Sequence, residues 1–389
     1  MKVLDGIRVL DLGSYIAAPY CGLLLGELGA EVIKVERPGA ADPSRNVVVH
    51  GRSTVFNAFN RNKRGLALDY AKPAGRAVLD QLVARSDVLI INVRPGVEKK
   101  IGVDAERLQA LNPRLVYCAI TGFGPDGPYA HRPVYDNVGQ ALSGVSSRFH
   151  QGGDARVGGT AMSDNITGMQ ACIGILGALV ERGATGRGRK VEINLLEANM
   201  GFAIEPLMHF LSSGEVPGFY YRGGVSQAYT VTCRDGKRIG LHLSNSDKFW
   251  QNFTTAIGQP DLGQRYAQAA QRVSGYGAIA AELARVFATR DRDHWLPILE
   301  AHDVPHGAEH GLDEIEADPQ VRHLHSFAPV DPSTWGTDRV PCRVVRYDGD
   351  NQSTFRPAPR VGGHSEEILT ELGLDAAAIA ALRAQAIIG

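Results

Sequence analysis

Short apolar runs of strand length alternate with longer amphipathic stretches along residues 7–120. Runs rich in Val, Ile and Leu are typical of strands buried on both faces, and a helix between two such strands makes a βαβ unit. This alternation predicts an α/β fold with a mainly parallel sheet. We expect strands at 7–12, 31–35, 64–68, 86–92 and 115–120, and helices at 19–28, 74–85 and 105–111.

The loops that follow the predicted strands are candidates for binding a ligand, because ligands of open α/β sheets bind at the carboxyl ends of the strands. These loops are rich in glycine, proline and polar residues, and they occupy residues 13–15, 36–39, 92–96 and 121–125. We expect them to form the mouth of the binding site.

The first βαβ unit differs from a dinucleotide-binding unit in its first turn. Glu36 closes the second strand where such folds carry a ribose-binding acid, but residues 11–19 lack the GxGxxG fingerprint. Without those glycines the backbone does not bring a pyrophosphate onto the helix N-terminus in the usual way. This argues against nicotinamide chemistry, and no Walker A sequence is present.

The alternation stops near residue 211. A long helix at 165–182 and a strand at 190–195 come before it, and a β-hairpin is predicted at 229–243 across Asp235-Gly236. A chain of 389 residues exceeds the size of one hydrophobic core, so two lobes are expected. The expected parts are a large α/β domain at 1–210, a linker with a glycine loop at 211–227, a small α+β domain at 228–325, and a return to the large domain at 326–389.

The composition indicates a soluble cytoplasmic protein. Lys and Arg number 41 against 42 Asp and Glu, so no global field favours nucleic acid or an anionic membrane. The longest apolar run, 171–180, is half of the ~20 residues that span a membrane. No targeting segment is apparent at the N-terminus. The five cysteines and twelve histidines lack metal-ligand spacing, so we expect no metal.

Basic residues recur in the predicted site loops. Each alone is typical of a solvated surface, but together they suit a phosphorylated ligand, because guanidinium and ammonium groups pair with phosphate oxygens. The set is Arg37, Lys63, Arg64, Arg94, Lys99 and Lys100.

Two further segments have both a structural and a chemical interpretation. Asp164 lies where the long helix begins, and an aspartate there is ordinarily an N-cap. Gly223 and Gly224 are typical of a flexible turn, although such a loop can close over a reacting centre and donate N–H groups to an oxyanion. Local chemistry alone favours the structural interpretation of both.

From about residue 4 to the C-terminus, the order of segments resembles the family III CoA-transferases, which include formyl-CoA:oxalate and carnitine CoA-transferases. The segments that carry the resemblance are 28–39, 62–64, 92–96, 134–138, 163–165 with the helix to 185–188, 318–319 and 357–365.

The resemblance implies a function and a set of site residues. Asp164 matches the family's nucleophile, which attacks an acyl-CoA thioester, and Gly223 and Gly224 match a shortened glycine loop. Ile16 and Tyr135 fall at substrate-side positions. Coenzyme A would be a substrate, with no tightly bound cofactor, and its binding positions, together with Arg94 of the basic set, are Arg37, Leu68, Asn92, Val93, Arg94, Val97 and Lys100.

The resemblance also implies an architecture and a reaction. The family has a Rossmann-like large domain formed by both termini, a smaller domain between them, and two chains interlocked in a homodimer. Coenzyme A would pass from an acyl-CoA donor to a carboxylic acid acceptor through an aspartyl anhydride and an aspartyl-CoA thioester.

The sequence departs from two groups of this family. Ile16 and Pro133 stand where the oxalate enzymes keep Gln and Lys, which argues against oxalate as the acceptor. Tyr135 stands where the related α-methylacyl-CoA racemases keep a catalytic His, and a phenol with a pKa of about 10 is a poor base at neutral pH. A racemase-like isomerase and a non-catalytic CoA-binding protein remain the alternatives to a CoA-transferase.

Overall fold

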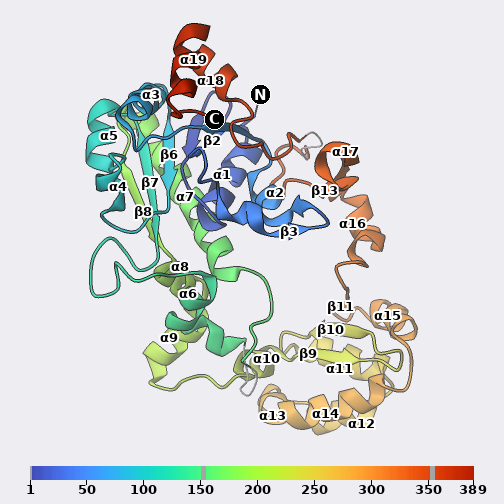
Figure 1. Cartoon of the computed structure of the whole chain (residues 1–389). Helices are drawn as coiled ribbons and strands as arrows, with labels where there is room; N and C mark the ends of the chain where they lie inside the picture. The colour runs from blue at the N-terminus through green and yellow to red at the C-terminus, as the bar shows by residue number, and fades with distance from the viewer. Residues whose placement is uncertain (1, 150–154, 351–354) are drawn as a thin grey trace. The chain divides into compact units, whose positions relative to one another are not determined.

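The computed structural model describes residues 2–149, 155–350 and 355–389 and divides into two compact units (Figure 1). Unit 1 comprises Met1–Leu207 with Phe327–Gly389, and unit 2 comprises Met208–Ser326. The boundary at residue 207 falls within helix α9 (Ile204–Ser213). Residues 211–227, expected as a linker, contain the end of α9 and helix α10 (Tyr221–Ser226), and they lie in unit 2.

Unit 1 is built on a six-stranded parallel sheet, which confirms the predicted α/β fold. Its strands are β1 (Arg8–Asp11), β2 (Glu31–Glu36), β5 (Lys63–Ala67), β6 (Val88–Ile91), β7 (Val116–Thr121) and β8 (Lys190–Asn194). The order is β5-β2-β1-β6-β7-β8. The chain therefore winds outward in both directions from β1 and β6. The junction between these two strands is the topological switch point, where α/β sheets of this kind bind ligands.

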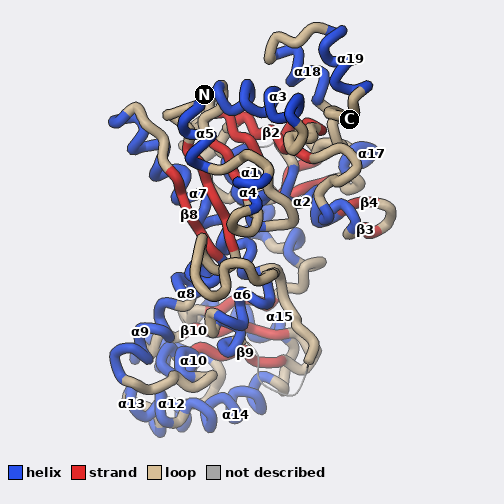
Figure 2. Tube along the Cα trace, turned by 60° about the vertical axis from the view of Figure 1, so that its left-hand side comes forward, coloured by secondary structure: helices blue, strands red, loops and turns tan. Residues whose placement is uncertain are grey.

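Helices cover both faces of this sheet (Figure 2). Successive strand residues point to opposite faces, so in β1 Val9 joins one core cluster and Leu10 the other. Helices α1 (Ala17–Glu27) and α7 (Met162–Thr185) pack on the Val9 face, and α3 (Pro73–Ala84) and α5 (Ala105–Leu111) on the Leu10 face.

The C-terminal segment completes the Leu10 face. Helices α18 (Ser365–Glu371) and α19 (Ala376–Ala384) contribute Ile368, Leu369 and Ile379 to its core. The Ser365 hydroxyl accepts a hydrogen bond from the Ala67 N–H at 3.1 Å, which fixes α18 to β5. The remaining elements of unit 1 are η1 (Pro43–Asn46), β3 (Val48–Val49), β4 (Arg52–Ser53), α2 (Thr54–Asn60), α4 (Val97–Lys100), α6 (Asp136–Leu142), η2 (Val145–Arg148), α8 (Leu195–Phe202), β12 (Phe327–Pro329), α17 (Pro332–Trp335) and β13 (Arg339–Pro341).

Unit 2 is an antiparallel sheet packed against helices. Strands β9 (Ala228–Thr232) and β10 (Arg238–His242) pair as the predicted hairpin, which is confirmed, and β11 (His306–Glu309) adds to β10. The core contains Trp250, Phe253, Phe287 and Trp295. The helices are α10, α11 (Asp247–Ala256), α12 (Pro260–Arg265), α13 (Ala269–Ser274), α14 (Tyr276–Phe287), α15 (Arg292–Ala301), η3 (Ile315–Ala317) and α16 (Pro319–His323).

Candidate functional site

A cavity of about 190 Å³ lies at the carboxyl edge of the six-stranded sheet in unit 1. Segments that follow β1, β6 and β7 form its wall, and the first turn of α7 contributes Asp164. This is the edge predicted from the loops of the sequence. Side chains that line the cavity include Tyr15, Ile16, Asn92, Val93, Arg94, Arg132, Tyr135 and Asp164.

Asn92 and Ser14 lock the switch point between β1 and β6. The Asn92 Oδ1 accepts the Ser14 N–H at 2.9 Å, and the Asn92 Nδ2 donates to the Ser14 carbonyl at 2.8 Å. This reciprocal pair ties the loop after β6 to the loop after β1, 78 residues apart in sequence. Asn92, predicted as a CoA-binding position, therefore also fixes the shape of the cavity.

A buried ionic network supports the loop after β1. The Lys63 ammonium donates to Asp11 Oδ2 at 2.7 Å, and Lys34 pairs with Asp42 at 3.0 Å and donates to the Gly13 carbonyl. Burial lowers the pKa of Lys63 to about 8, although the nearby Asp11 opposes that shift. Asp42 in turn accepts the N–H of Tyr15 at 3.1 Å. The network holds the loop that presents Tyr15 and Ile16 to the cavity.

The prediction of phosphate binding is wrong for two residues of the basic set. Lys63 is fully buried and bound to Asp11, so it faces no ligand. Arg64 is buried among the carboxylates of Glu31 and Glu371, beside the amino end of β2 and therefore at the opposite edge of the sheet. Both side chains satisfy internal acids, which the sequence pattern did not reveal.

The predicted CoA-binding positions of unit 1 lie along the carboxyl edge. Arg37 follows β2, Leu68 follows β5, and residues 92–94 follow β6. Val97 and Lys100 begin and end α4. The Leu68 side chain is buried in the core, and its N–H donates to the Glu36 carbonyl.

Asp164 occupies the third position of α7 and does not cap it. The helix begins at Met162, and its N-cap residue, Ala161, makes no side-chain cap. The expectation of an N-capping aspartate is therefore wrong. The Asp164 side chain is half-buried and lines the cavity, and within the described part of the chain no hydrogen bond ends on its carboxylate.

Asp136 from α6 supplies the missing acceptor for α7. Its Oδ1 accepts the Asp164 N–H at 3.1 Å, and its Oδ2 accepts from Gln140 Nε2 at 2.6 Å. Burial, and then the negative charge of Asp136, raise the pKa of the Asp164 carboxyl to about 7. Asp136 begins α6, and nothing in the sequence signals its contact with Asp164.

Tyr15 and Tyr135 form an aromatic pair at the cavity. Their ring centroids lie 5.4 Å apart in an edge-on arrangement, and their hydroxyl oxygens lie 3.5 Å apart. The bond to Tyr135 raises the pKa of the Tyr15 phenol, so Tyr15 is a poor base at neutral pH. Tyr135 is 60% exposed, which leaves its ring accessible to a substrate.

Gly223 and Gly224, predicted to form a glycine loop, lie in helix α10, so the predicted loop conformation is wrong. The Gly224 N–H donates to the Tyr220 carbonyl at 2.8 Å. A Cβ at Gly223 would lie 2.8 Å from the Tyr276 hydroxyl, so this glycine admits the close approach of Tyr276. This packing accounts for the glycine at position 223, so the glycine is not evidence for a mobile lid.

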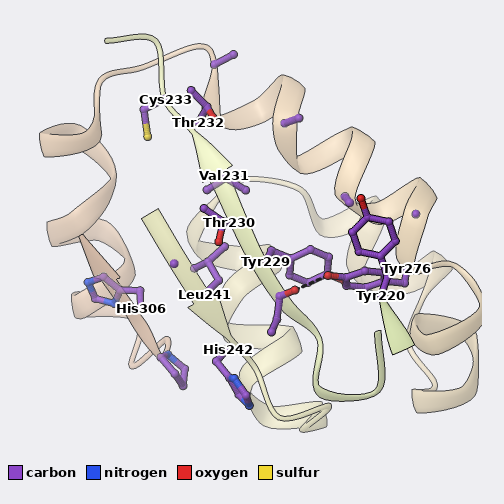
Figure 3. Close-up of a pocket in the computed structure, with 17 residues that line it drawn as sticks. Tyr220, Tyr229, Thr230, Val231, Thr232, Cys233, Leu241, His242, Tyr276 and His306 are labelled. Carbon is purple, nitrogen blue, oxygen red and sulfur yellow. Dashed lines mark hydrogen bonds between the residues drawn. The ribbon is translucent and has the colours of Figure 1, made fainter. Parts of the chain in front are cut away.

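Unit 2 has its own cavity, of about 1080 Å³, over β9, β10 and α14 (Figure 3). Tyr229 and Tyr276 stack at one end with ring centroids 4.9 Å apart, and the Tyr276 hydroxyl donates to the Ala228 carbonyl. His242 and His306 lie toward another part of the wall. The lining is mainly apolar and contains neither aspartate nor glutamate.

The described residues contain neither a cluster of metal-ligand side chains nor a helix that could span a membrane. No group of three or more His, Cys, Asp or Glu side chains among them is arranged to hold a metal ion. Across residues 2–149, 155–350 and 355–389, no helix combines the length and apolar character needed to cross a membrane.

Comparison with known proteins gives matches over nearly the whole chain. A sequence profile of CoA-transferase family III matches residues 4–365. Succinyl-CoA:glutarate CoA-transferase of Mus musculus is 32% identical over 380 residues, which cover 96% of this chain and 87% of the relative. Formyl-CoA:oxalate CoA-transferase of Rhodopseudomonas palustris (strain BisA53) is 31% identical, over 95% of this chain and 93% of the relative. The crystal structure of a CAIB/BAIF family protein from Brucella suis aligns with a TM-score of 0.81 at 31% identity and covers 96% of this chain and all of the other.

Proposed function

Because this chain belongs to CoA-transferase family III and is a CoA-transferase, we propose that the Asp164 carboxylate is the covalent nucleophile of the transfer. The family match confirms the resemblance seen in the sequence. One observation carries the proposal for Asp164: its carboxylate lines the cavity at the switch point and is bound to no other group in the described residues. An unengaged carboxylate is free to attack.

The reaction proceeds by four exchanges at acyl carbons. Asp164 attacks the donor thioester, the C–S bond breaks, and the products are a mixed anhydride and CoA thiolate. The thiolate attacks the Asp164 carbonyl, which releases the donor acid and leaves an aspartyl-CoA thioester. The acceptor carboxylate then attacks that thioester to give a second anhydride and thiolate. The thiolate finally attacks the acceptor's acyl carbon, and Asp164 leaves as a carboxylate.

The mechanism requires the CoA thiolate to stay close to Asp164 between these steps. Binding the nucleotide part of CoA along the carboxyl edge makes the later attacks intramolecular, which is worth several orders of magnitude in rate. Four exposed cations near that edge make no ion pair among the described residues and suit the phosphates: Arg37, Arg94, Lys99 and Lys100.

The first N–H groups of α7 lie beside Asp164, but three of them are already hydrogen-bonded. The N–H groups of Met162, Asp164 and Asn165 are already bonded to acceptors on Thr160, Asp136 and Ala161. The first turn of α7 therefore does not offer these three groups to a tetrahedral intermediate.

The acceptor is proposed to be a dicarboxylic acid longer than oxalate. The two relatives named above act on glutarate and oxalate. Ile16 and Pro133, which stand where oxalate enzymes keep Gln and Lys, both line this cavity. Arg132 also lines it, with its guanidinium 4.2 Å from the Tyr129 ring centroid and no ion pair in the described chain. A guanidinium placed there suits a second carboxylate of the acceptor.

An interlocked homodimer in the cytoplasm remains part of the proposal. Helix α7 exposes apolar side chains, with Ile173 60% and Val180 78% exposed, and α9 exposes Leu211 at 64%. Apolar helix faces of this kind favour coverage by a second chain. All five cysteines are free thiols, as expected in a reducing compartment.

Isotope transfer tests the nucleophile. The enzyme is incubated with succinyl-CoA or acetyl-CoA and a panel of carboxylates, and new thioesters are detected by mass spectrometry. If the accepted acid carries ¹⁸O in its carboxylate, the mechanism leaves one ¹⁸O atom on Asp164, which peptide mass spectrometry locates. An active enzyme with no label at Asp164 would contradict the proposal.

Two variants control this experiment. Asp164→Asn should bind CoA in calorimetry but form no new thioester and take up no label. Asp261→Asn, which changes an exposed aspartate of helix α12 in unit 2, should behave as wild type.

A further inference from the structure

Asp136 links two helices at the nucleophile. It is the first residue of α6, and its two carboxylate oxygens are bonded to different groups. Oδ1 accepts the backbone N–H of Asp164, and Oδ2 accepts from the Gln140 side chain one turn along α6. Gln140 is buried, so the Asp136 carboxylate is held in place from behind.

The packing of α6 against α7 leaves little freedom for this contact. A Cβ at Gly139 of α6 would lie 2.6 Å from the Ser163 hydroxyl oxygen, so only a glycine allows the helices to approach this closely. Ser163 is fully buried, and its hydroxyl accepts from Asn199 Nδ2 at 2.5 Å. The backbone on which Asp164 stands is therefore held from two sides.

We propose that Asp136 is a positioning residue for the Asp164 nucleophile, a role that rests on the function proposed above. It takes over the capping that the first turn of α7 requires, so that the carboxylate of Asp164 stays unbonded in the cavity. Helices ordinarily satisfy their first N–H groups with a side chain at the N-cap, and Ala161 has none to offer. If Asp164 turned back to cap its own helix, its oxygens would be withdrawn from the substrate.

The negative charge of Asp136 gives this residue a second effect. A like charge disfavours ionisation of a neighbouring carboxyl, and a carboxylate of higher pKa is the stronger nucleophile. Burial and Asp136 are the two causes that raise the pKa of Asp164. Other titratable or charged groups on the elements around Asp164 are Tyr15, Tyr20, Arg94, Arg132, Tyr135 and Glu197, and none of them is among the causes of that shift.

Two substitutions separate the cap from the charge. Asp136→Asn keeps an acceptor oxygen for the Asp164 N–H, and the Gln140 amide can turn over to accept from the new side-chain NH₂. Asp136→Ala removes both the acceptor and the charge. In both variants the acid limb of the pH dependence of kcat/KM should move down by about 1 pH unit, as expected for loss of a neighbouring charge. Only Asp136→Ala should also lose about tenfold to a hundredfold in kcat, because the nucleophile is misplaced.

A purely structural role gives a different pattern. In that case both variants lose thermal stability and leave the acid limb at its wild-type midpoint, which overturns the proposal. A full kcat in Asp136→Ala overturns the capping part of it.

A titration that does not depend on turnover separates this inference from the proposed function. The Asp164 carboxyl is followed by ¹³C NMR of aspartate-labelled protein and assigned by its loss in Asp164→Asn. If Asp164→Asn keeps transferase activity, the nucleophile assignment fails whatever the titration shows. If Asp164→Asn is inactive but Asp136→Asn leaves the Asp164 titration unmoved, the role of Asp136 alone is overturned.

Discussion

Two aspartates of unit 1, Asp11 and Asp164, are both withdrawn from water, yet the pKa values of their carboxyl groups are shifted in opposite directions. Asp11 ends β1 and is fully buried, and Asp164 lies in the first turn of α7 and is half-buried. Burial is the largest influence on the pKa of each and raises it in both cases. The net pKa of Asp11 is nevertheless below its usual value, whereas that of Asp164 rises to about 7.

The partners of the two carboxyl groups explain this contrast. Asp11 faces the ammonium groups of Lys34 and Lys63 and accepts the Gly13 N–H, and together these outweigh burial. For Asp164, the one charged group among the described residues that shifts the pKa is Asp136, which has the same charge. The more deeply buried acid is thus a fixed structural anion, and the less buried one is poised to titrate near neutrality. Charge partners, rather than depth, separate a structural acid from a candidate nucleophile.

The largest expected effect is on stability at Asp11. Asp11→Ala leaves Lys63 buried without its carboxylate, and loss of one partner of a buried pair costs about 3–5 kcal/mol. Asp164→Ala breaks no side-chain hydrogen bond and also removes a carboxyl whose ionisation destabilises the fold, so it should cost less than about 1 kcal/mol or raise the stability. Urea denaturation of both variants measures the difference. Adding Lys63→Met to Asp11→Ala should recover part of the loss, because the orphaned charge is removed. Equal losses in the two single variants would contradict the contrast.

The second prediction is a gain in stability, in contrast to the loss expected at Asp11. The pKa of Asp164 is raised on folding, so its stabilising effect is complete below its unfolded pKa and is lost as the pH rises through about 7. Asp164→Asn has no carboxylate to ionise, so it should be more stable than wild type above about pH 7. We expect a gain of ~2 kcal/mol in the free energy of unfolding. This is half of the value that the pKa shift alone implies, because the cavity admits water.

Thermal unfolding across a pH series measures this stabilisation. The gain should shrink toward zero below about pH 3, where Asp164 is protonated in both states. The exposed Asp261→Asn should show no such trend. A gain that is constant with pH would mean that the substitution acts through packing and that Asp164 is an ordinary exposed acid.

The third prediction concerns activity. In the proposed mechanism Asp164 attacks as the carboxylate, so kcat/KM should fall about tenfold per pH unit below a midpoint near 7. Asp11, whose pKa is lowered, should add no limb in this range. Steady-state rates over a pH series test this, with CoA binding measured by calorimetry at each pH as the control for titration of the substrate's own phosphates. A midpoint near about 4 would show that Asp164 titrates like a solvated aspartate.

The six strands of the parallel sheet in unit 1, and helices α1, α3, α5 and α7, could be predicted because each is determined locally. An apolar run such as Val88–Ile91, which is buried on both faces, can be recognised as a strand from its own residues alone. Antiparallel β11 has the sequence His-Gly-Ala-Glu, with no apolar alternation, and forms only because β10 offers it an edge. Local pattern therefore predicts the parallel sheet and misses strands that depend on a partner.

The site could be predicted less completely, for a related reason. The pairing of Lys63 with Asp11 joins residues 52 positions apart, and the contact of Asp136 with Asp164 joins residues 28 apart. The sequence shows a basic or an acidic residue, but not which charged group that residue contacts. The pattern therefore assigns Lys63 to a ligand and gives no sign that Asp136 contacts Asp164. Position within the fold decides both.

The smallest expected effect is at Tyr135, which shares the cavity with Asp164. Its hydroxyl lies 3.5 Å from that of Tyr15 and is exposed, so Tyr135→Phe removes a weak contact worth at most about 0.5 kcal/mol, a factor of ~2 in kcat/KM. Incubation of a 2-methylacyl-CoA in deuterated solvent should give no exchange at its α-carbon with either wild type or variant, because CoA transfer breaks no C–H bond. A loss above about a hundredfold in Tyr135→Phe, together with deuterium exchange in wild type, would place proton transfer on the phenol. Asp164 would then share the chemistry with a second group, and a racemase-like activity would return as the better description of this cavity.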